Sequence, residues 1–193
     1  KRYKPTVCGV GYWGCEDVDT DSTAYNKWHG ILHRCYSTKV HEKYPEYIGC
    51  IVSEEWKNFS NFRYWYEKNN YGGSNLNLDK DILYKGNKIY SPDTCCLVPG
   101  FINTLFTNRK ANRGELPLGV YKEEKNGKTC YRAGMEVNGQ SIKLGTFKTP
   151  EEAFQKYKEY KEQYIKDTAK RYKDKIPYSV YEAMMNWKVE ITD

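Results

Sequence analysis

Two carboxylates flank a lysine at Asp79, Lys80 and Asp81, where the side chains could act on a phosphate. The reference pKa of lysine is about 10.4 and adjacent carboxylates favour its charged form, so we expect Lys80 to be an ammonium at pH 7. An ammonium can stabilise the charge that develops on a phosphate during cleavage, but it is a poor general base. A solvated ion pair at the end of a strand is the alternative interpretation of the same three residues.

A second chemical feature is a basic stretch, residues 107–148, with 9 basic and 4 acidic side chains. The whole chain has a net charge of +6, so most of the positive excess falls in this stretch. A concentrated basic strip is the usual electrostatic footprint of a protein that binds a polyanion. An ordinary solvated surface is the alternative, because the excess is modest.

The seven cysteines offer a third kind of chemistry. Their number is odd and no Cys-x-x-Cys pair occurs, which argues against a disulfide scaffold and against a zinc ribbon. We therefore expect reduced, buried thiols. A zinc site formed by Cys35, Cys50, Cys95 and Cys96 is the alternative.

Length and composition exclude several classes of protein. The chain has 193 residues, enough for one domain or two small ones. It is 29% charged, has a mean hydropathy of −0.89 and contains no apolar run of the roughly 18 residues that a membrane span needs. Nineteen tyrosines argue against a disordered or collagen-like chain. The first residues lack the apolar core of a secretory signal, so we expect a cytoplasmic protein.

The elements that must position Asp79 and Lys80 are two helices followed by a ββα unit. Apolar residues at helical spacing predict helices over 21–36 and 53–70, with a short strand over 50–52 between them. A strand over 76–83, an apolar strand over 95–98 and a short helix over 99–105 then predict a ββα unit at about 76–106.

The second half predicts a small sheet packed on a helix. A basic linker over 107–118 precedes strands over 119–123, 129–137 and 140–147, and Asn-Gly pairs between these strands indicate hairpins. Thr149 and Glu152 form a capping box that begins a long helix. We expect this module to span 119–170, followed by a short helix and tail over 171–193.

Four short motifs carry a resemblance: Gly-Val-Tyr at 119–121, Tyr-Arg-Ala at 131–133, Leu-Gly-Thr-Phe at 144–147 and Thr-Pro-Glu-Glu-Ala at 149–153. They make residues 119–164 similar to the ethylene-response-factor (APETALA-type) DNA-binding domain. The resemblance implies that one face of the sheet lies in the major groove while the other packs on the helix. A structural or protein-binding sheet is the alternative. The predicted DNA contacts are Arg109, Lys110, Arg113, Tyr121, Lys122, Lys128, Tyr131, Arg132 and Lys143.

A second resemblance covers residues 25–106. Its motifs include Arg-Cys-Tyr at 34–36, Glu-Glu-Trp at 54–56, Leu-Asp-Lys at 78–80 and Tyr-Ser-Pro-Asp-Thr-Cys at 90–95. This stretch resembles a bacteriophage family described as HNH-endonuclease-like, whose members often carry a C-terminal APETALA-type domain. The resemblance implies a general-base histidine, an orienting asparagine and a divalent metal on the ββα unit.

Mapped onto this chain, the HNH pattern is kept at some positions and absent at others. Asp79 and Asn103 occupy the metal-ligand positions, whereas Lys80 replaces the general-base histidine and Thr94 replaces the orienting asparagine. The candidate catalytic residues are thus Asp79, Lys80 and Asp81, with Mg²⁺ or Mn²⁺ as cofactor if the site is active.

Together these patterns predict an α+β protein with an N-terminal HNH-like module over 1–106 and a C-terminal sheet–helix module. The predicted function is that of a phage-type DNA-binding protein in the host cytoplasm, with a degenerate metal-dependent endonuclease site. One alternative is a non-cutting DNA-binding or regulatory protein. Another is a phage inhibitor that binds a host defence protein or a nucleotide signal.

Overall fold

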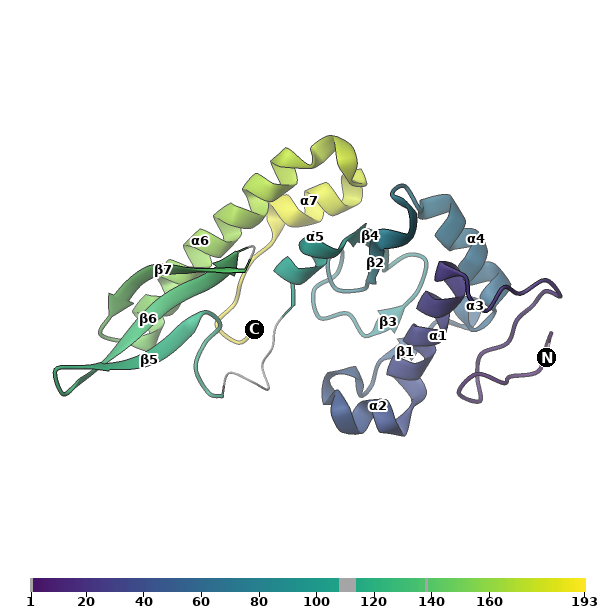
Figure 1. Cartoon of the computed structure of the whole chain (residues 1–193), viewed down its shortest axis with the longest axis horizontal. Helices are drawn as coiled ribbons and strands as arrows, with labels where there is room; N and C mark the ends of the chain where they lie inside the picture. Colours follow the sequence, from purple (N-terminus) through teal and green to yellow (C-terminus); the bar gives the residue numbers. More distant parts are fainter. Residues whose placement is uncertain (1, 108–113, 138) are drawn as a thin grey trace. The chain divides into compact units, whose positions relative to one another are not determined.

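The chain divides into two compact units, Lys1–Phe106 and Thr107–Asp193. The structure is a computed structural model that describes residues 2–107, 114–137 and 139–193 (Figure 1). Its class is α+β, as the sequence predicts. No helix among the described residues is long and apolar enough to cross a membrane.

The first unit is built around buried aromatic side chains on short helices. Helix α1 begins where the Ser22 hydroxyl accepts the Tyr25 N–H at 3.2 Å, two residues after the predicted start, and its predicted end at Tyr36 is confirmed. The indole Nε1 of Trp28, which is fully buried, donates to the carbonyl of Trp56 at 2.6 Å. The helical elements of this unit are α1 (Thr23–Tyr36), α2 (Thr38–Lys43), η1 (Pro45–Tyr47), α3 (Glu54–Lys57), α4 (Phe59–Asn69), η2 (Gly73–Asn75) and α5 (Gly100–Leu105).

The helix predicted over 53–70 is wrong in one respect, because it is two helices broken at Asn58. The backbone of Asn58 is extended, and its side chain accepts the Ser60 N–H at 3.0 Å, which begins α4. Tyr12 fills the break: its N–H donates to Lys57 and its carbonyl accepts from Phe59. The N-terminal segment therefore pairs with the chain between the two helices.

The first unit also contains the predicted ββα arrangement. Strand β2 (Leu76–Asp79) pairs antiparallel with β4 (Cys96–Pro99), so that Asp79 lies opposite Cys96, and α5 follows β4 directly. Strand β1 (Ile51–Val52) pairs in parallel with β3 (Ile89–Tyr90) in a separate two-stranded sheet. The strand predicted over 76–83 ends early, at Asp79, because the side chain of that residue turns the chain.

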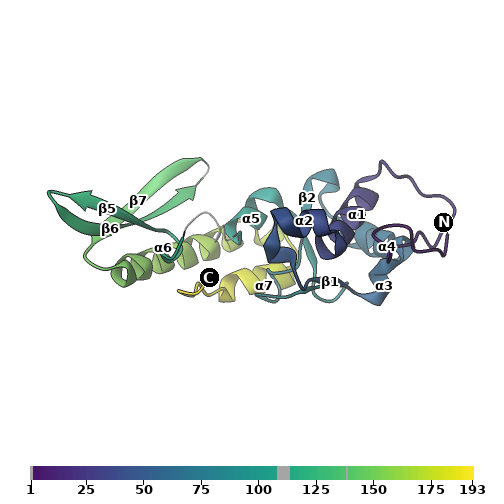
Figure 2. The ribbon, with the colours of Figure 1, turned by 90° about the horizontal axis from the view of Figure 1, so that it is seen from below.

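The second unit is a three-stranded antiparallel sheet next to one long helix. The strands β5 (Val120–Lys125), β6 (Lys128–Val137) and β7 (Gln140–Phe147) follow one another in space, as predicted. Asn126 and Gly127 both have positive φ, the conformation of a tight hairpin turn between twisted strands. Figure 2 shows helix α6 (Pro150–Arg171) running along one face of the sheet.

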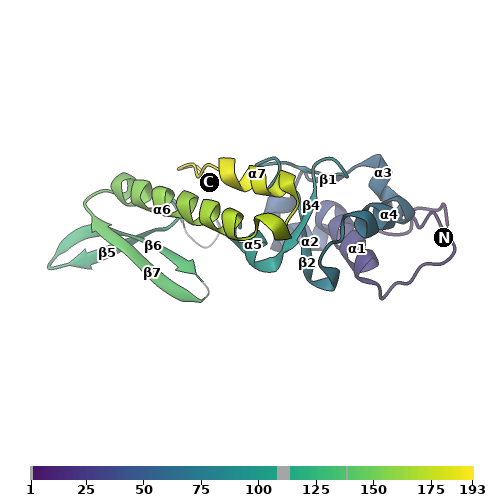
Figure 3. The same cartoon turned by 90° about the horizontal axis from the view of Figure 1, so that it is seen from above.

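Helix α6 begins at the predicted capping box: the Thr149 hydroxyl accepts the Glu152 N–H at 3.2 Å, and the Glu152 carboxylate accepts the Thr149 N–H. After η4 (Lys173–Lys175), helix α7 (Tyr178–Asn186) turns back and packs beside α6 (Figure 3). The core between sheet and helix is formed by Val120, Ala133, Met135, Ala153, Phe154, Tyr157 and Val189.

Candidate functional site

Lys80 closes the loop that follows strand β2. The residue is 8% exposed, and its ammonium donates to both carboxylate oxygens of Asp81, each at 2.8 Å, and to the Asn87 carbonyl at 2.6 Å. Lysine has three N–H donors and, when protonated, no lone pair. Every ammonium proton thus has an acceptor in this loop, so Lys80 holds the loop as a cation and is not placed as a base.

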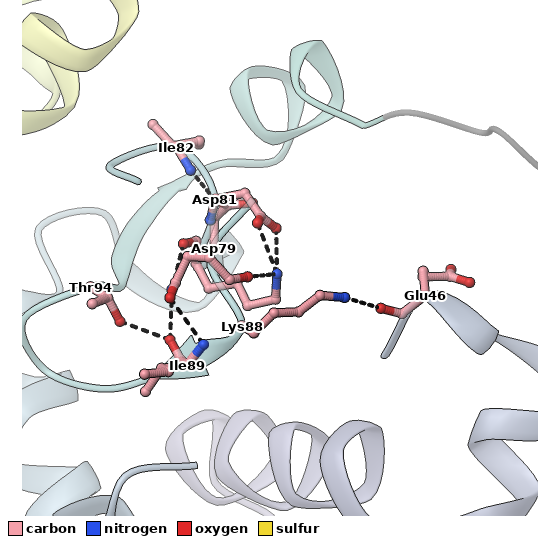
Figure 4. Close-up of polar contacts among 9 residues, drawn as sticks. Glu46, Asp79, Asp81, Ile82, Lys88, Ile89 and Thr94 are labelled. Carbon is pink, nitrogen blue, oxygen red and sulfur yellow. Dashed lines mark hydrogen bonds and ion pairs between the residues drawn. The ribbon is translucent and has the colours of Figure 1, made fainter. Parts of the chain in front are cut away.

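Asp79 turns the chain at the end of β2. Its Oδ1 accepts the N–H groups of Asp81 and Ile82, each at 2.7 Å (Figure 4). Burial raises the pKa of the Asp79 carboxyl, and these two hydrogen bonds oppose that rise. The carboxylate therefore serves as a cap for the backbone of the loop.

Asn87 is a residue of this loop to which the sequence patterns assign a turn but no chemical role. Its amide Nδ2 donates to the carbonyls of Lys80 and Ile89 at 2.9 and 2.7 Å, and its Oδ1 accepts the Ile89 N–H. Lys80 and Asn87 thus bond each other reciprocally, side chain to main chain in both directions. The only signal in the sequence is an asparagine in a Gly-Asn turn, which is too common to identify such a role.

Thr94, predicted to occupy the position of an orienting asparagine, also bonds the main chain. Its hydroxyl donates to the Ile89 carbonyl at 2.8 Å (Figure 4). The same hydroxyl lies 2.8 Å from the Ser91 hydroxyl. On the opposite side of the loop, the Lys88 ammonium donates to the Glu46 carbonyl. These contacts fix the loop from both sides, and none of them orients the Lys80 ammonium toward a substrate.

Asn103 lies on α5, which packs against β2 and β4, so the fold places the two predicted metal-ligand positions on neighbouring elements. However, the described residues contain no group of three or more His, Cys, Asp or Glu side chains that could share a metal ion. The nearby Lys80 ammonium would also repel a divalent cation. The Asp79 Oδ1 already accepts two main-chain N–H groups, and these would compete with a metal for that oxygen.

The histidines lie on other elements. His29 and His33 of α1 hydrogen-bond each other through their Nε2 atoms at 3.2 Å, and His41 of α2 bonds the Arg34 carbonyl at 2.8 Å. These histidine contacts lie on α1 and α2, outside the 79–89 segment.

The cysteines are all free thiols, and Cys35, Cys50, Cys95 and Cys96 are buried. Burial raises the pKa of Cys35 to about 12, and the proximity of Cys50 and Cys95 adds to the rise. Burial likewise raises the pKa of Cys95 to about 12. Such thiols stay protonated at neutral pH, as the expectation of reduced buried cysteines requires.

The second candidate site is the face of the sheet that points away from α6. Arg132 lies opposite Tyr121 in the strand register, and its guanidinium carbon is 4.4 Å from the centre of the tyrosine ring. Its Nε donates to the Glu123 carboxylate at 2.6 Å, and this bond lowers the pKa of Glu123. Gly134 leaves room for the arginine, because a Cβ there would lie 2.8 Å from its Nη1.

Further basic residues share this outer face. Lys125 and Lys128 are paired in register at the tip of the β5–β6 hairpin, and both are exposed. Lys143 on β7 is also exposed and lies opposite Gly134. Because successive strand residues point to opposite faces, these lysines fall on the same side as Arg132. We name the set of Tyr121, Glu123, Lys125, Lys128, Arg132 and Lys143 the outer sheet face.

The other predicted DNA contacts do not join this face. Tyr131 packs against the core beneath the sheet, and Lys122 lies opposite it in the register, on the helix side. Arg109, Lys110 and Arg113 lie outside the described residues. The structure therefore gathers Tyr121, Lys128, Arg132 and Lys143, and it separates Lys122 and Tyr131 from them.

The chain matches no protein-family model, no curated protein and no solved structure.

Proposed function

We propose that this chain is a DNA-binding protein that contacts the phosphate backbone and base edges through the outer sheet face. The observation that carries the proposal is the position of Arg132, stacked on Tyr121 and held through Nε by Glu123. With Nε occupied, the terminal guanidinium nitrogens remain to donate to a phosphate or to a base edge.

The surroundings of Arg132 support this use. Lys125, Lys128 and Lys143 add three cations to the same face, and Glu123 is the carboxylate among the six residues. Helix α6 packs on the opposite face, and Tyr121, Lys125, Lys128 and Lys143 are exposed on the outer one. The similarity of residues 119–164 to a DNA-binding domain favours DNA over another polyanion as the ligand.

The salt dependence of binding tests the proposal. Neutralising Arg132 and Lys143 with Arg132→Gln and Lys143→Gln should weaken duplex binding, because fewer phosphates are then paired with a cation. The slope of log K against log salt should fall by about 0.9 for each phosphate that the variant no longer neutralises. The measurement is fluorescence anisotropy of a labelled duplex at several salt concentrations.

Lys122→Gln provides the matched control, because it removes the same charge from the helix side of the same sheet. We expect its slope to stay near that of the unmodified chain. If the double variant kept the original slope, or if Lys122→Gln lowered it equally, the outer sheet face would not be the binding surface.

We further propose that binding occurs without DNA cleavage. The support comes from Lys80 and Asp79, whose polar atoms close and cap a loop. Protein incubated at neutral pH with supercoiled plasmid and Mg²⁺ or Mn²⁺ should give no nicked product. Nicking that disappears in Asp79→Ala would instead assign the chain an endonuclease activity, while leaving the DNA-binding proposal intact.

A further inference from the structure

The side chains of His29 and His33 meet on helix α1. They are four residues apart, one turn of helix, and their Nε2 atoms are 3.2 Å from each other. Their ring centres are 4.2 Å apart. Both residues are partly exposed, and neither belongs to the Asp79 loop or to the outer sheet face.

The packing of α1 fixes this pair. Trp28, Ile31 and Leu32 are fully buried, so the helix cannot rotate about its axis without exposing them. The Tyr25 ring stacks on the His29 imidazole, with ring centroids 5.9 Å apart and ring planes inclined by 28°. The two rings are therefore held in place before any ligand arrives, which reduces the entropic cost of binding.

We propose that His29 and His33 form a two-imidazole site for a late divalent transition metal such as Zn²⁺ or Cu²⁺. The distance between the nitrogens supports this assignment. Metal–nitrogen bonds of about 2.0–2.1 Å span a 3.2 Å separation when the angle at the metal is about 100°. That angle suits two adjacent ligands of a tetrahedral or a tetragonal ion.

The chemistry of the two imidazoles also suits a metal, because neutral imidazole nitrogen is the commonest metal ligand among side chains. In the structure one Nε2–H donates to the other Nε2, so binding requires that proton to leave or to move to Nδ1. Imidazole nitrogen favours zinc and copper, whereas magnesium prefers oxygen ligands.

The site has two protein ligands, since the described residues contain no larger cluster of His, Cys, Asp and Glu that could share a metal. Water completes the coordination, and the open positions leave the metal exchangeable. This site is independent of DNA binding by the outer sheet face.

Metal titration of the unmodified chain tests the proposal. Metal-free protein should bind one Zn²⁺ by calorimetry, and His29→Gln or His33→Gln should each weaken that affinity by about tenfold or more. His41→Gln is the matched control, because His41 lies on α2 and bonds the Arg34 carbonyl instead. We expect its affinity for Zn²⁺ to be unchanged, and we expect Mg²⁺ to give no binding heat.

A spectroscopic experiment needs no variant that could misfold. Cu²⁺ added to the unmodified chain at a one-to-one ratio should give an electron paramagnetic resonance spectrum with hyperfine splitting from two imidazole nitrogens. A spectrum with one nitrogen or none would overturn the proposal. So would Zn²⁺ binding that survives in His29→Gln and His33→Gln, or that is abolished only when Cys8, Cys15 and Cys130 are alkylated.

Discussion

At the scale of single residues, Lys80 shows how a position that suggests catalysis can hold a loop together. The expectation that it carries a charge agrees with its three bonds to Asp81 and Asn87. The sequence could not predict those partners, because one is a main-chain carbonyl seven residues away. A hydrogen bond from a side chain to a main-chain carbonyl cannot be recognised from the sequence, because every residue type has that carbonyl.

Lys80→Ala should destabilise the first unit by about 2–3 kcal/mol, because it leaves the Asn87 carbonyl and the partly buried Asp81 carboxylate without their donor. Urea unfolding followed by tryptophan fluorescence measures the effect, since this unit contains Trp13, Trp28, Trp56 and Trp65.

Lys68→Ala is the control for that substitution. Lys68 is exposed at the end of α4, and its removal should change the free energy of unfolding by no more than about 0.5 kcal/mol. Equal unfolding curves for Lys80→Ala and Lys68→Ala would show that the Lys80 bonds contribute no stability.

At the scale of elements, the hydrophobic pattern predicts α1, α5, α6 and α7, but it misses α2 and the break between α3 and α4. Trp56, Phe59 and Phe62 are all buried, so their spacing reads as one continuous helix. The break comes from Tyr12, whose main chain pairs across Asn58 from a distant part of the sequence. No local pattern contains that information.

Gly14→Ala tests how the N-terminal segment fits against this break. Gly14 has a φ of +72°, and a Cβ there would lie 1.9 Å from the Asn58 side-chain oxygen. We expect a decrease in stability of about 2 kcal/mol or more, from backbone strain and from displacement of the α4 cap. Thermal or urea unfolding gives the value.

Gly30→Ala is the matched substitution in the same unit. Gly30 lies inside α1, and a Cβ there meets nothing within 4 Å. We expect an increase in stability of about 0.5–1 kcal/mol from the higher helix propensity of alanine. A destabilised Gly30→Ala, or a Gly14→Ala as stable as the unmodified chain, would contradict this description of the two glycines.

At the scale of the whole molecule, the sequence predicts the α+β class and the strand–strand–strand–helix order of the second unit, both confirmed. It does not predict which strand residues share a face, because β5 reads Val-Tyr-Lys-Glu-Glu-Lys and is polar on both sides after Val120. In the structure, Tyr131 contacts the core, which places its side chain on the helix side of the sheet. Lys122 lies opposite Tyr131 in the strand register and therefore falls on the same side.

The reciprocal bonds between Lys80 and Asn87 also limit which substitutions the 79–89 segment can accept. Lys80→His would introduce the residue type of a general base, but it would remove the donor that closes the loop onto the Asn87 carbonyl. The substitution would thus weaken the same segment that must hold the new base. A working base at position 80 would require coordinated changes across the whole 79–89 segment, so we expect no single substitution there to supply one.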